Sequence, residues 1–253
     1  MAVKLSPEEK AAHRAAFQKM TPAQKLDHII TYYKLPIVLA VAALAVLIST
    51  AVHVARKKEA VLYLGLANLS VSESTKELLT TSFLTATGRN PRRSEVYLYE
   101  ALYLSDDPDA QDHEYAYASQ LKLMASVNAG RMDLLLMNRE AYDLLSEKGY
   151  LADLSELPAA QADSVLAEAA PYLTRGEVVL SDNALEVSLG EAAEHVRTTK
   201  EAVNGVLVSD VPALRGIGFS GDVYLGIAGN TSRLTECLSY LHYILQAPPE
   251  TAP

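Results

Sequence analysis

The sequence predicts an α/β protein that begins with a transmembrane helix. Residues 35–55 form a run of 21 residues without an Asp, Glu, Lys or Arg side chain. After residue 58, apolar runs of strand length alternate with longer amphipathic stretches. This alternation is typical of α/β domains, and about 195 residues remain there, enough for a substantial core.

The apolar run from Leu35 to Ala55 has the length of a membrane span. At about 1.5 Å per helical residue it reaches roughly 31 Å, close to the hydrocarbon thickness of a bilayer. A cleaved signal peptide is the alternative interpretation, but 34 residues precede the run and its length exceeds the usual apolar core of such a peptide. No Cys follows the run directly, as a lipid anchor would require. We therefore expect a transmembrane helix over 35–55, with the lipid bilayer as a partner.

Charge divides the chain at this helix. Residues 1–58 hold nine Lys or Arg against three Asp or Glu, whereas the remainder holds 13 basic and 28 acidic residues. So acidic a domain repels phosphate backbones, which argues against a nucleic-acid partner. The single Cys, Cys237, cannot form an intramolecular disulfide, so packing must stabilise the domain.

The amino-terminal segment, residues 1–34, is expected to be a cytoplasmic helical tail. Ser6 to Glu9 and Thr21 to Gln24 each match a helix-capping signal, and the second helix either rests on the bilayer surface or docks a cytoplasmic partner. Basic residues within about 20 positions of the span are equal in number on both sides. Lys4, Lys10 and Arg14 add to the amino-terminal side, which favours a cytoplasmic amino terminus and an extracytoplasmic large domain.

In the first half of the large domain, each element follows from its local pattern. Ala60 to Ala67 is a continuous apolar run suited to a buried strand. The pattern then predicts a helix over 73–86, a strand over 95–103, a helix over 112–129 with Tyr117, Leu121 and Met124 on one face, a strand over 132–137, and a helix that begins after Asn138 and ends at Gly149.

Signals in the second half are weaker until the last two elements. We predict a helix near 159–169, strands near 177–181 and 184–189, a helix near 190–200 and a short strand at 206–208. A strand over 222–228 and a helix over 231–246 follow, the latter with an apolar stripe of Leu234, Leu238, Leu241 and Leu245.

Two motifs that suggest chemistry fail on their context. Gly216, Gly218 and Gly221 match the dinucleotide fingerprint, but the predicted strand follows the glycines instead of preceding them, so a turn is the better interpretation. The acidic loop from Asp106 to Glu114 lacks the glycine that a calcium-binding loop of the EF-hand type needs. With no nucleophile and base that can be paired, we expect no enzyme, no cofactor and no metal site.

Polar side chains follow several predicted strands. Asn68, Asn138 and Asn230 each stand where a buried strand gives way to a helix, and Ser105 follows another strand. Ligands of open α/β sheets bind at the carboxyl edge of the strands, so these four residues are the candidate ligand-binding set. Helix capping and turn formation explain the three asparagines without a ligand and are the favoured interpretation.

Two stretches resemble a known family. Asp133-Leu-Leu-Leu-Met-Asn-Arg-Glu-Ala141, continued by Gly149-Tyr-Leu-Ala-Asp-Leu154, and the segment from Tyr224 to Gln246 resemble extracellular solute-binding proteins of ABC transporters, of the type II periplasmic-binding-protein-like class. The resemblance implies a domain over 59–247 with two α/β lobes that enclose a small solute. Lobe 1 would comprise 59–155 and 222–247, and a short lobe 2 would comprise 156–221.

This resemblance implies a function in binding. The chain is expected to be a single-pass, membrane-anchored solute-binding-like protein that presents a small-molecule-binding or degenerate domain to a membrane transporter or sensor. The solute would be a sugar or a peptide, although the chain has no Trp to stack on a sugar ring. The alternative is a non-catalytic structural or assembly protein that binds another membrane protein.

Overall fold

The computed structural model describes residues 21–22, 36, 38–50, 58–106, 112–190, 194–215, 219 and 221–246. The chain divides into two compact units, Met1–Lys57 and Lys58–Pro253. In the first unit, residues 38–50 are helical. No helix within the described ranges is both long and apolar enough to cross a membrane. Residues 35, 37 and 51–55 of the expected span, and the expected tail helices apart from residues 21–22, lie outside the described residues.

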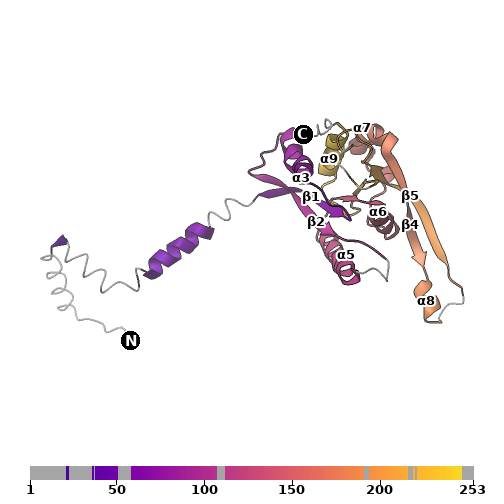
Figure 1. Cartoon of the computed structure of the whole chain (residues 1–253), viewed down its shortest axis with the longest axis horizontal. Coiled ribbons are helices and arrows are strands. Elements are labelled where there is room, and N and C mark those ends of the chain that lie inside the picture. Colours follow the sequence, from indigo (N-terminus) through magenta and orange to yellow (C-terminus); the bar gives the residue numbers. More distant parts are fainter. Residues whose placement is uncertain are drawn as a thin grey trace. The chain divides into compact units, whose positions relative to one another are not determined.

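The second unit contains one mixed six-stranded sheet in the order β2-β1-β3-β6-β5-β4 (Figure 1). Neighbours β2, β1 and β3 run parallel, and β6, β5 and β4 continue the sheet with antiparallel pairings. The strands are β1 (Glu59–Ala67), β2 (Ser94–Leu102), β3 (Leu134–Met137), β4 (Leu173–Asp182), β5 (Arg197–Leu207) and β6 (Tyr224–Ile227). The predicted α/β class is confirmed.

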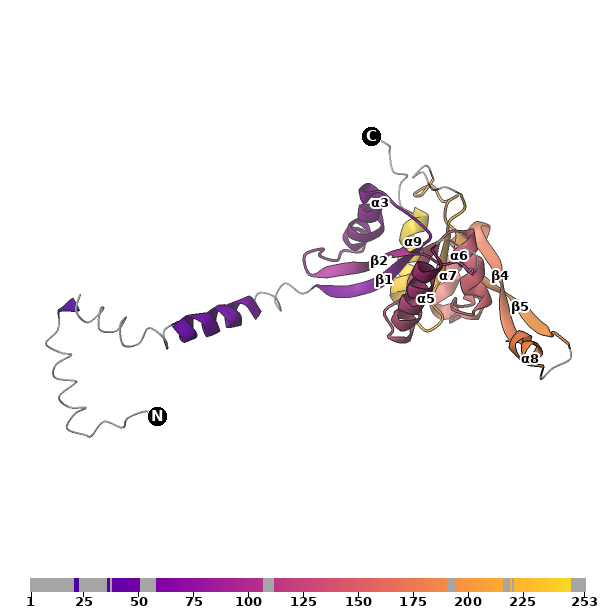
Figure 2. The same cartoon turned by 60° about the horizontal axis from the view of Figure 1, so that its bottom comes forward.

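Helices cover both faces of this sheet (Figures 1 and 2). The first helical stretch is continuous from Glu73 to Ala86, because α3 passes into a π-helical turn and then α4. The helical elements are α3 (Glu73–Glu77), η1 (Leu78–Ser82), α4 (Phe83–Ala86), α5 (His113–Asn128), α6 (Arg139–Glu147), η2 (Leu154–Glu156), α7 (Ala159–Ala169), η3 (Ala170–Tyr172), α8 (Ala184–Ser188) and α9 (Leu234–Gln246).

Two apolar cores lie on the two faces of the sheet. Leu62, Leu64 and Leu66 of β1 join the core that contains residues of α4, α7 and α9. Ala67 of β1 and Leu135 of β3 join the second core, which contains residues of α5 and α6. Because β1 and β3 are covered on both faces, their sequences are continuous apolar runs, which is why the pattern located them within two residues at either end.

Helix α5 presents an unexpected face to the core. Ala116, Ser119, Leu123 and Val127 are buried, whereas the predicted apolar face of Tyr117, Leu121 and Met124 is exposed. The apolar stripe seen in the sequence therefore faces solvent. The face that packs on the core carries smaller side chains. The helical spacing of these apolar residues correctly predicted a helix, but it predicted the wrong face to be buried.

The segment from 184 to 200 is the largest departure from prediction. Residues 184–188 form helix α8 instead of a strand, and residues 197–200 of the helix predicted near 190–200 are the start of β5. Asp182 explains the first change, since its Oδ1 accepts a hydrogen bond from the Ala184 N–H and starts a helical turn. Residues 197–201 of β5 are exposed on both faces, so they carry no alternation that indicates a strand.

The second lobe expected at 156–221 is not shown as a separate body. This segment supplies α7, β4 and β5, and β5 pairs with β6 through Val206 and Leu207. The two added strands therefore extend the sheet that holds β1 and β3, and the outer half of the β4–β5 hairpin projects beyond it (Figure 1). Two residues of β5 pair with β6, and contact with α6 also holds the hairpin on the domain.

Helix α6 docks on the hairpin through a buried hydrogen-bonded network. The Tyr142 hydroxyl donates to Asn204 Oδ1 (2.7 Å), and Asn204 Nδ2 donates to Ser146 Oγ (2.7 Å). Ser146 in turn donates to the carbonyl of Glu177 (3.0 Å). Asn204 and Ser146 are fully buried, and every polar side-chain atom of the network has a partner, so its burial carries little desolvation cost.

Two glycines allow this close approach. A Cβ atom added at Gly176 would overlap the Ser146 side chain and lie 2.7 Å from Asn204 Oδ1, and one added at Gly205 would overlap the ring of Tyr142. Neither position has a positive φ angle, so the requirement for glycine is one of space and not of backbone conformation.

Substituting Gly176→Ala is expected to destabilise the domain, because the added methyl forces α6 away from the hairpin. The free energy of unfolding should fall by about 1–3 kcal/mol. Urea denaturation of the purified chain, followed by circular dichroism, measures this change. Gly229→Ala is the matched control, since its Cβ would lie 3.5 Å from the nearest heavy atom, an ordinary contact. Equal stability of the two variants would contradict the tight packing of α6 on β4.

Native Cys237 is expected to be unreactive toward thiol reagents. The side chain is fully buried in α9, and burial raises the pKa of its thiol to about 12. At pH 8 only about one thiol in ten thousand would then be ionised. Dithiobis(nitrobenzoate) should label one thiol per chain in 6 M guanidinium chloride but label the native protein only at the rate of local or global opening. Immediate labelling of the native chain would contradict the packing of α9.

Candidate functional site

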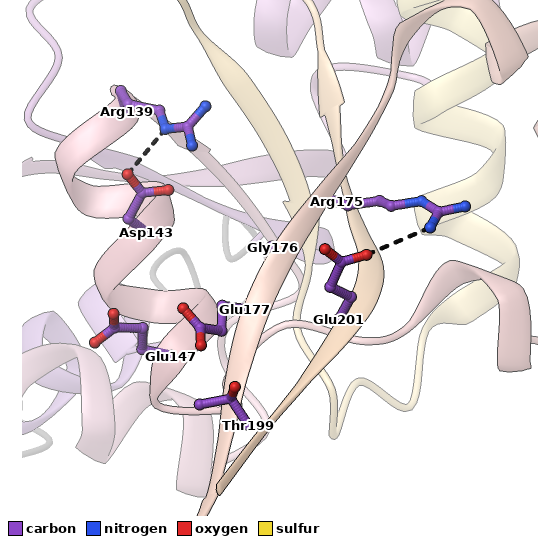
Figure 3. Close-up of a pocket in the computed structure, with 8 residues that line it drawn as sticks. All are labelled: Arg139, Asp143, Glu147, Arg175, Gly176, Glu177, Thr199 and Glu201. Carbon is purple, nitrogen blue, oxygen red and sulfur yellow. Dashed lines mark hydrogen bonds and ion pairs between the residues drawn. The ribbon is translucent and has the colours of Figure 1, made fainter. Parts of the chain in front are cut away.

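A charged groove lies between α6 and the β4–β5 hairpin. It encloses about 600 Å³. Figure 3 shows side chains of α6 along one side and side chains of the two hairpin strands along the other. The groove is lined by Arg139, Asp143, Glu147, Arg175, Gly176, Glu177, Thr199 and Glu201.

Ion pairs fix most of the charged side chains of this groove. Arg139 Nε donates to Asp143 Oδ2 (2.8 Å), and Arg175 Nη1 donates to Glu201 Oε2 (3.4 Å). Glu147 pairs with Arg197 at the rim (3.0 Å), and this carboxylate raises the pKa of the Arg197 guanidinium. Glu177 has no cationic side chain within 4.0 Å in the part of the chain that the structure describes. The groove therefore holds arranged charges of both signs with an excess of carboxylate.

A stacked aromatic pair supports one end of the groove. The rings of Tyr142 and Tyr224 lie 4.6 Å apart and nearly parallel, at 14°. The Arg139 guanidinium lies over both rings, 5.9 and 5.7 Å from their centroids, and donates to the Tyr224 hydroxyl. Hydrogen bonds to Asp143 and then to Tyr224 raise the pKa of Arg139 above its usual value. This cation is thus oriented before any ligand arrives.

Three of the four predicted ligand-binding residues lie at the expected sheet edge. Asn68, Ser105 and Asn138 follow β1, β2 and β3, and because these strands are parallel their carboxyl ends meet at one edge. Their interactions are largely internal. Asn68 bonds both the N–H and the carbonyl of Leu104 at 2.7 Å, and Asn138 Oδ1 accepts from the Ala141 N–H (2.9 Å) as a helix cap. Ser105 is buried and its carbonyl accepts from Gln120.

Asn230 lies at the opposite edge of the sheet. Strand β6 is antiparallel to β3, with Ile227 opposite Leu134 and Tyr224 opposite Met137. The residues that follow β6 therefore lie beside the start of β3, and Asn230 Nδ2 donates to the carbonyl of Val127 at the end of α5 (2.7 Å). The expectation that Asn230 shares a site with Asn68 and Asn138 is wrong, because a local sequence pattern does not reveal strand direction. A role of the other three in binding a solute stays a prediction.

Sequence reasoning did not identify Asp133 as a central residue of that opposite edge. Its fully buried carboxylate accepts from the Tyr63 N–H (2.9 Å) and the Thr231 hydroxyl (2.6 Å). Arg233 Nη1 also reaches it (3.4 Å), while the guanidinium covers the ring of Tyr63 at 4.9 Å. These contacts join the start of β3 to the end of β6, so the arrangement is structural.

The groove residues of the hairpin were also missed. Arg175, Glu177, Thr199 and Glu201 come from strands whose extent the sequence pattern did not reveal. The sequence did predict the start of α6, because Asn138 is a helix cap. Arg139 and Asp143 therefore fall on the first turns of that helix.

No group of three or more His, Cys, Asp or Glu side chains among the described residues is arranged to hold a metal ion. The acidic loop between Asp106 and Asp112 lies outside the described residues, as do Gly216 and Gly218. Strand β6 does follow these glycines, which is the order that argues against a dinucleotide site.

Comparison of the chain with protein-family models, with curated proteins and with solved structures gives no match.

Proposed function

We propose that this chain is a single-pass membrane protein whose α/β domain binds a small polar solute in the groove between α6 and the β4–β5 hairpin. The amino terminus is cytoplasmic and the domain is extracytoplasmic, where it presents the solute to a membrane transporter or sensor. The uncharged run 35–55 and its basic flanks support the membrane anchor.

The observation that carries the binding function is the groove itself. Its charged groups come from a helix and two strands, are held by ion pairs, and leave the Glu177 carboxylate and the Thr199 hydroxyl as further hydrogen-bonding groups. Such preorganised groups suit a solute with both donors and acceptors, such as a sugar or a short peptide.

A second candidate is a structural or assembly role for a domain that has lost solute binding. It is favoured by the internal hydrogen bonds of Asn68, Asn138 and Asn230, since these side chains are engaged in turns, a helix cap and a loop contact. In that case the domain binds another membrane protein through its surface, and neither candidate requires catalysis.

Solute binding in the groove should stabilise the domain against heat. The purified full-length chain in detergent is screened with sugars, amino acids and short peptides, and a solute at 100 times its dissociation constant should add about 2.7 kcal/mol. Glu177→Gln should reduce this stabilisation, because it removes a charged acceptor from the groove. Glu186→Gln, a change of the same kind on α8 outside the groove, should not. A library without any stabilising solute, or one whose effect is the same in both variants, favours the assembly role.

Membrane orientation can be tested with protease added to intact cells or spheroplasts. The large domain should be digested from outside, while an epitope placed at the amino terminus survives until the membrane is permeabilised. Protection of the domain in intact cells, with digestion only after lysis, would reverse the orientation proposed here.

A further inference from the structure

The end of the β4–β5 hairpin carries a group of exposed apolar side chains, which we call the hairpin tip. Its members are Leu180, Leu185, Leu189 and Val196, with exposed fractions of 60, 70, 63 and 56%. Figures 1 and 2 both show α8 at the end of the hairpin, away from the other labelled elements of the domain. None of these four side chains belongs to either apolar core.

The hairpin tip is held in shape by polar interactions. Asn183 bridges its two sides, since its Nδ2 donates to the Glu194 carbonyl (3.0 Å) and its Oδ1 accepts from the Val196 N–H (2.6 Å). Asp182 Oδ1 lies 2.8 Å from His195 Nε2 and also accepts from the Ala184 N–H. These two contacts lower the pKa of the Asp182 carboxyl. Polar contacts therefore order the tip while its leucines stay in water.

Four large apolar side chains gathered at the end of one projection indicate an interaction site. Single exposed leucines are common on protein surfaces, but here Leu185 lies in α8, Leu189 follows as the C-cap of that helix, and Leu180 and Val196 flank it. Burial of such side chains in a complex is favourable because it removes apolar surface from water. The tip therefore offers a compact apolar anchor that costs little further ordering on binding.

The charges around the tip indicate its partner. Glu186 and Glu194 are exposed, and neither has a cationic side chain within 4.0 Å in the described ranges. Nearby Arg197 and His195 are engaged with Glu147 and Asp182. A second copy packed tip to tip would bring these carboxylates together, and an anionic lipid surface would repel them. Both considerations favour a different protein with basic side chains.

We propose that the hairpin tip docks into an apolar pocket of another protein whose rim carries Lys or Arg. Leu185 and Leu189 fill the pocket, and Glu186 and Glu194 pair with the basic rim. This docking surface is separate from the groove, because Glu177 and Thr199 lie nearer the base of the hairpin. It therefore stands whether or not the groove binds a solute.

Photocrosslinking from the tip tests this docking surface. The full-length chain with benzoylphenylalanine at position 185 is expressed in its own cells and irradiated. We expect one discrete adduct with a second polypeptide, and about tenfold less adduct after Glu186→Lys or Glu194→Lys, as like charges would then face each other. Asp163→Lys, a charge reversal at an exposed site on α7, is the matched control and should leave the yield unchanged.

The remaining outcomes overturn the proposal. An adduct of twice the mass of the chain would indicate a second copy, and an adduct with lipid alone would indicate a membrane surface. A polypeptide adduct that is equally abundant in all three charge variants would show that no basic rim is involved. Because Glu186 lies within α8, Glu194→Lys in the adjoining loop keeps the test valid if Glu186→Lys unfolds that short helix.

Discussion

The contact between α6 and the β4–β5 hairpin determines where every candidate surface of this domain lies. Tyr142, Asn204 and Ser146 form a buried chain of hydrogen bonds, and Gly176 lets the two elements approach closely enough to make it. Removing one partner would leave a buried polar group unpaired, which costs more than a typical hydrogen bond contributes. The network thus favours a single position of α6 on the hairpin. In a shifted position, fewer of these polar groups would have a hydrogen-bond partner.

The same contact explains why the groove is charged. At its centre the approach is too close for any side chain at Gly176 or Gly205, so larger side chains are confined to the margins. There α6 carries Arg139 and Asp143, and the hairpin carries Arg175 and Glu201. Solvent at these margins reduces the desolvation cost of the charged side chains. The groove is therefore the outer part of a packing interface whose inner part is uncharged and buried.

Sequence patterns located the strands that are buried on two faces, β1 and β3, and failed on the outer part of the β4–β5 hairpin. Strands β1 and β3 are flanked by both cores, and their continuous apolar runs were sufficient. The outer hairpin is exposed, and its cohesion comes from the pairing of β4 with β5 and from the Asn183 bridge, neither of which leaves a periodic signal. Asn138 was placed correctly because capping is local, whereas the site of Asn230 depended on the direction of β6.

The groove and the hairpin tip differ in what a partner must supply. Most charged groups in the groove are already paired, so a solute has to replace the water and ion-pair contacts it disturbs, and complementarity of hydrogen bonds decides affinity. At the tip, Asp182 and Asn183 are hydrogen-bonded within the tip and the leucines are free to be buried, so apolar contact provides the affinity and Glu186 and Glu194 provide selectivity. Both surfaces belong to one hairpin, and the network at Asn204 holds its base against α6. A partner at the tip therefore binds a projection whose position is fixed by the contact that also forms the groove.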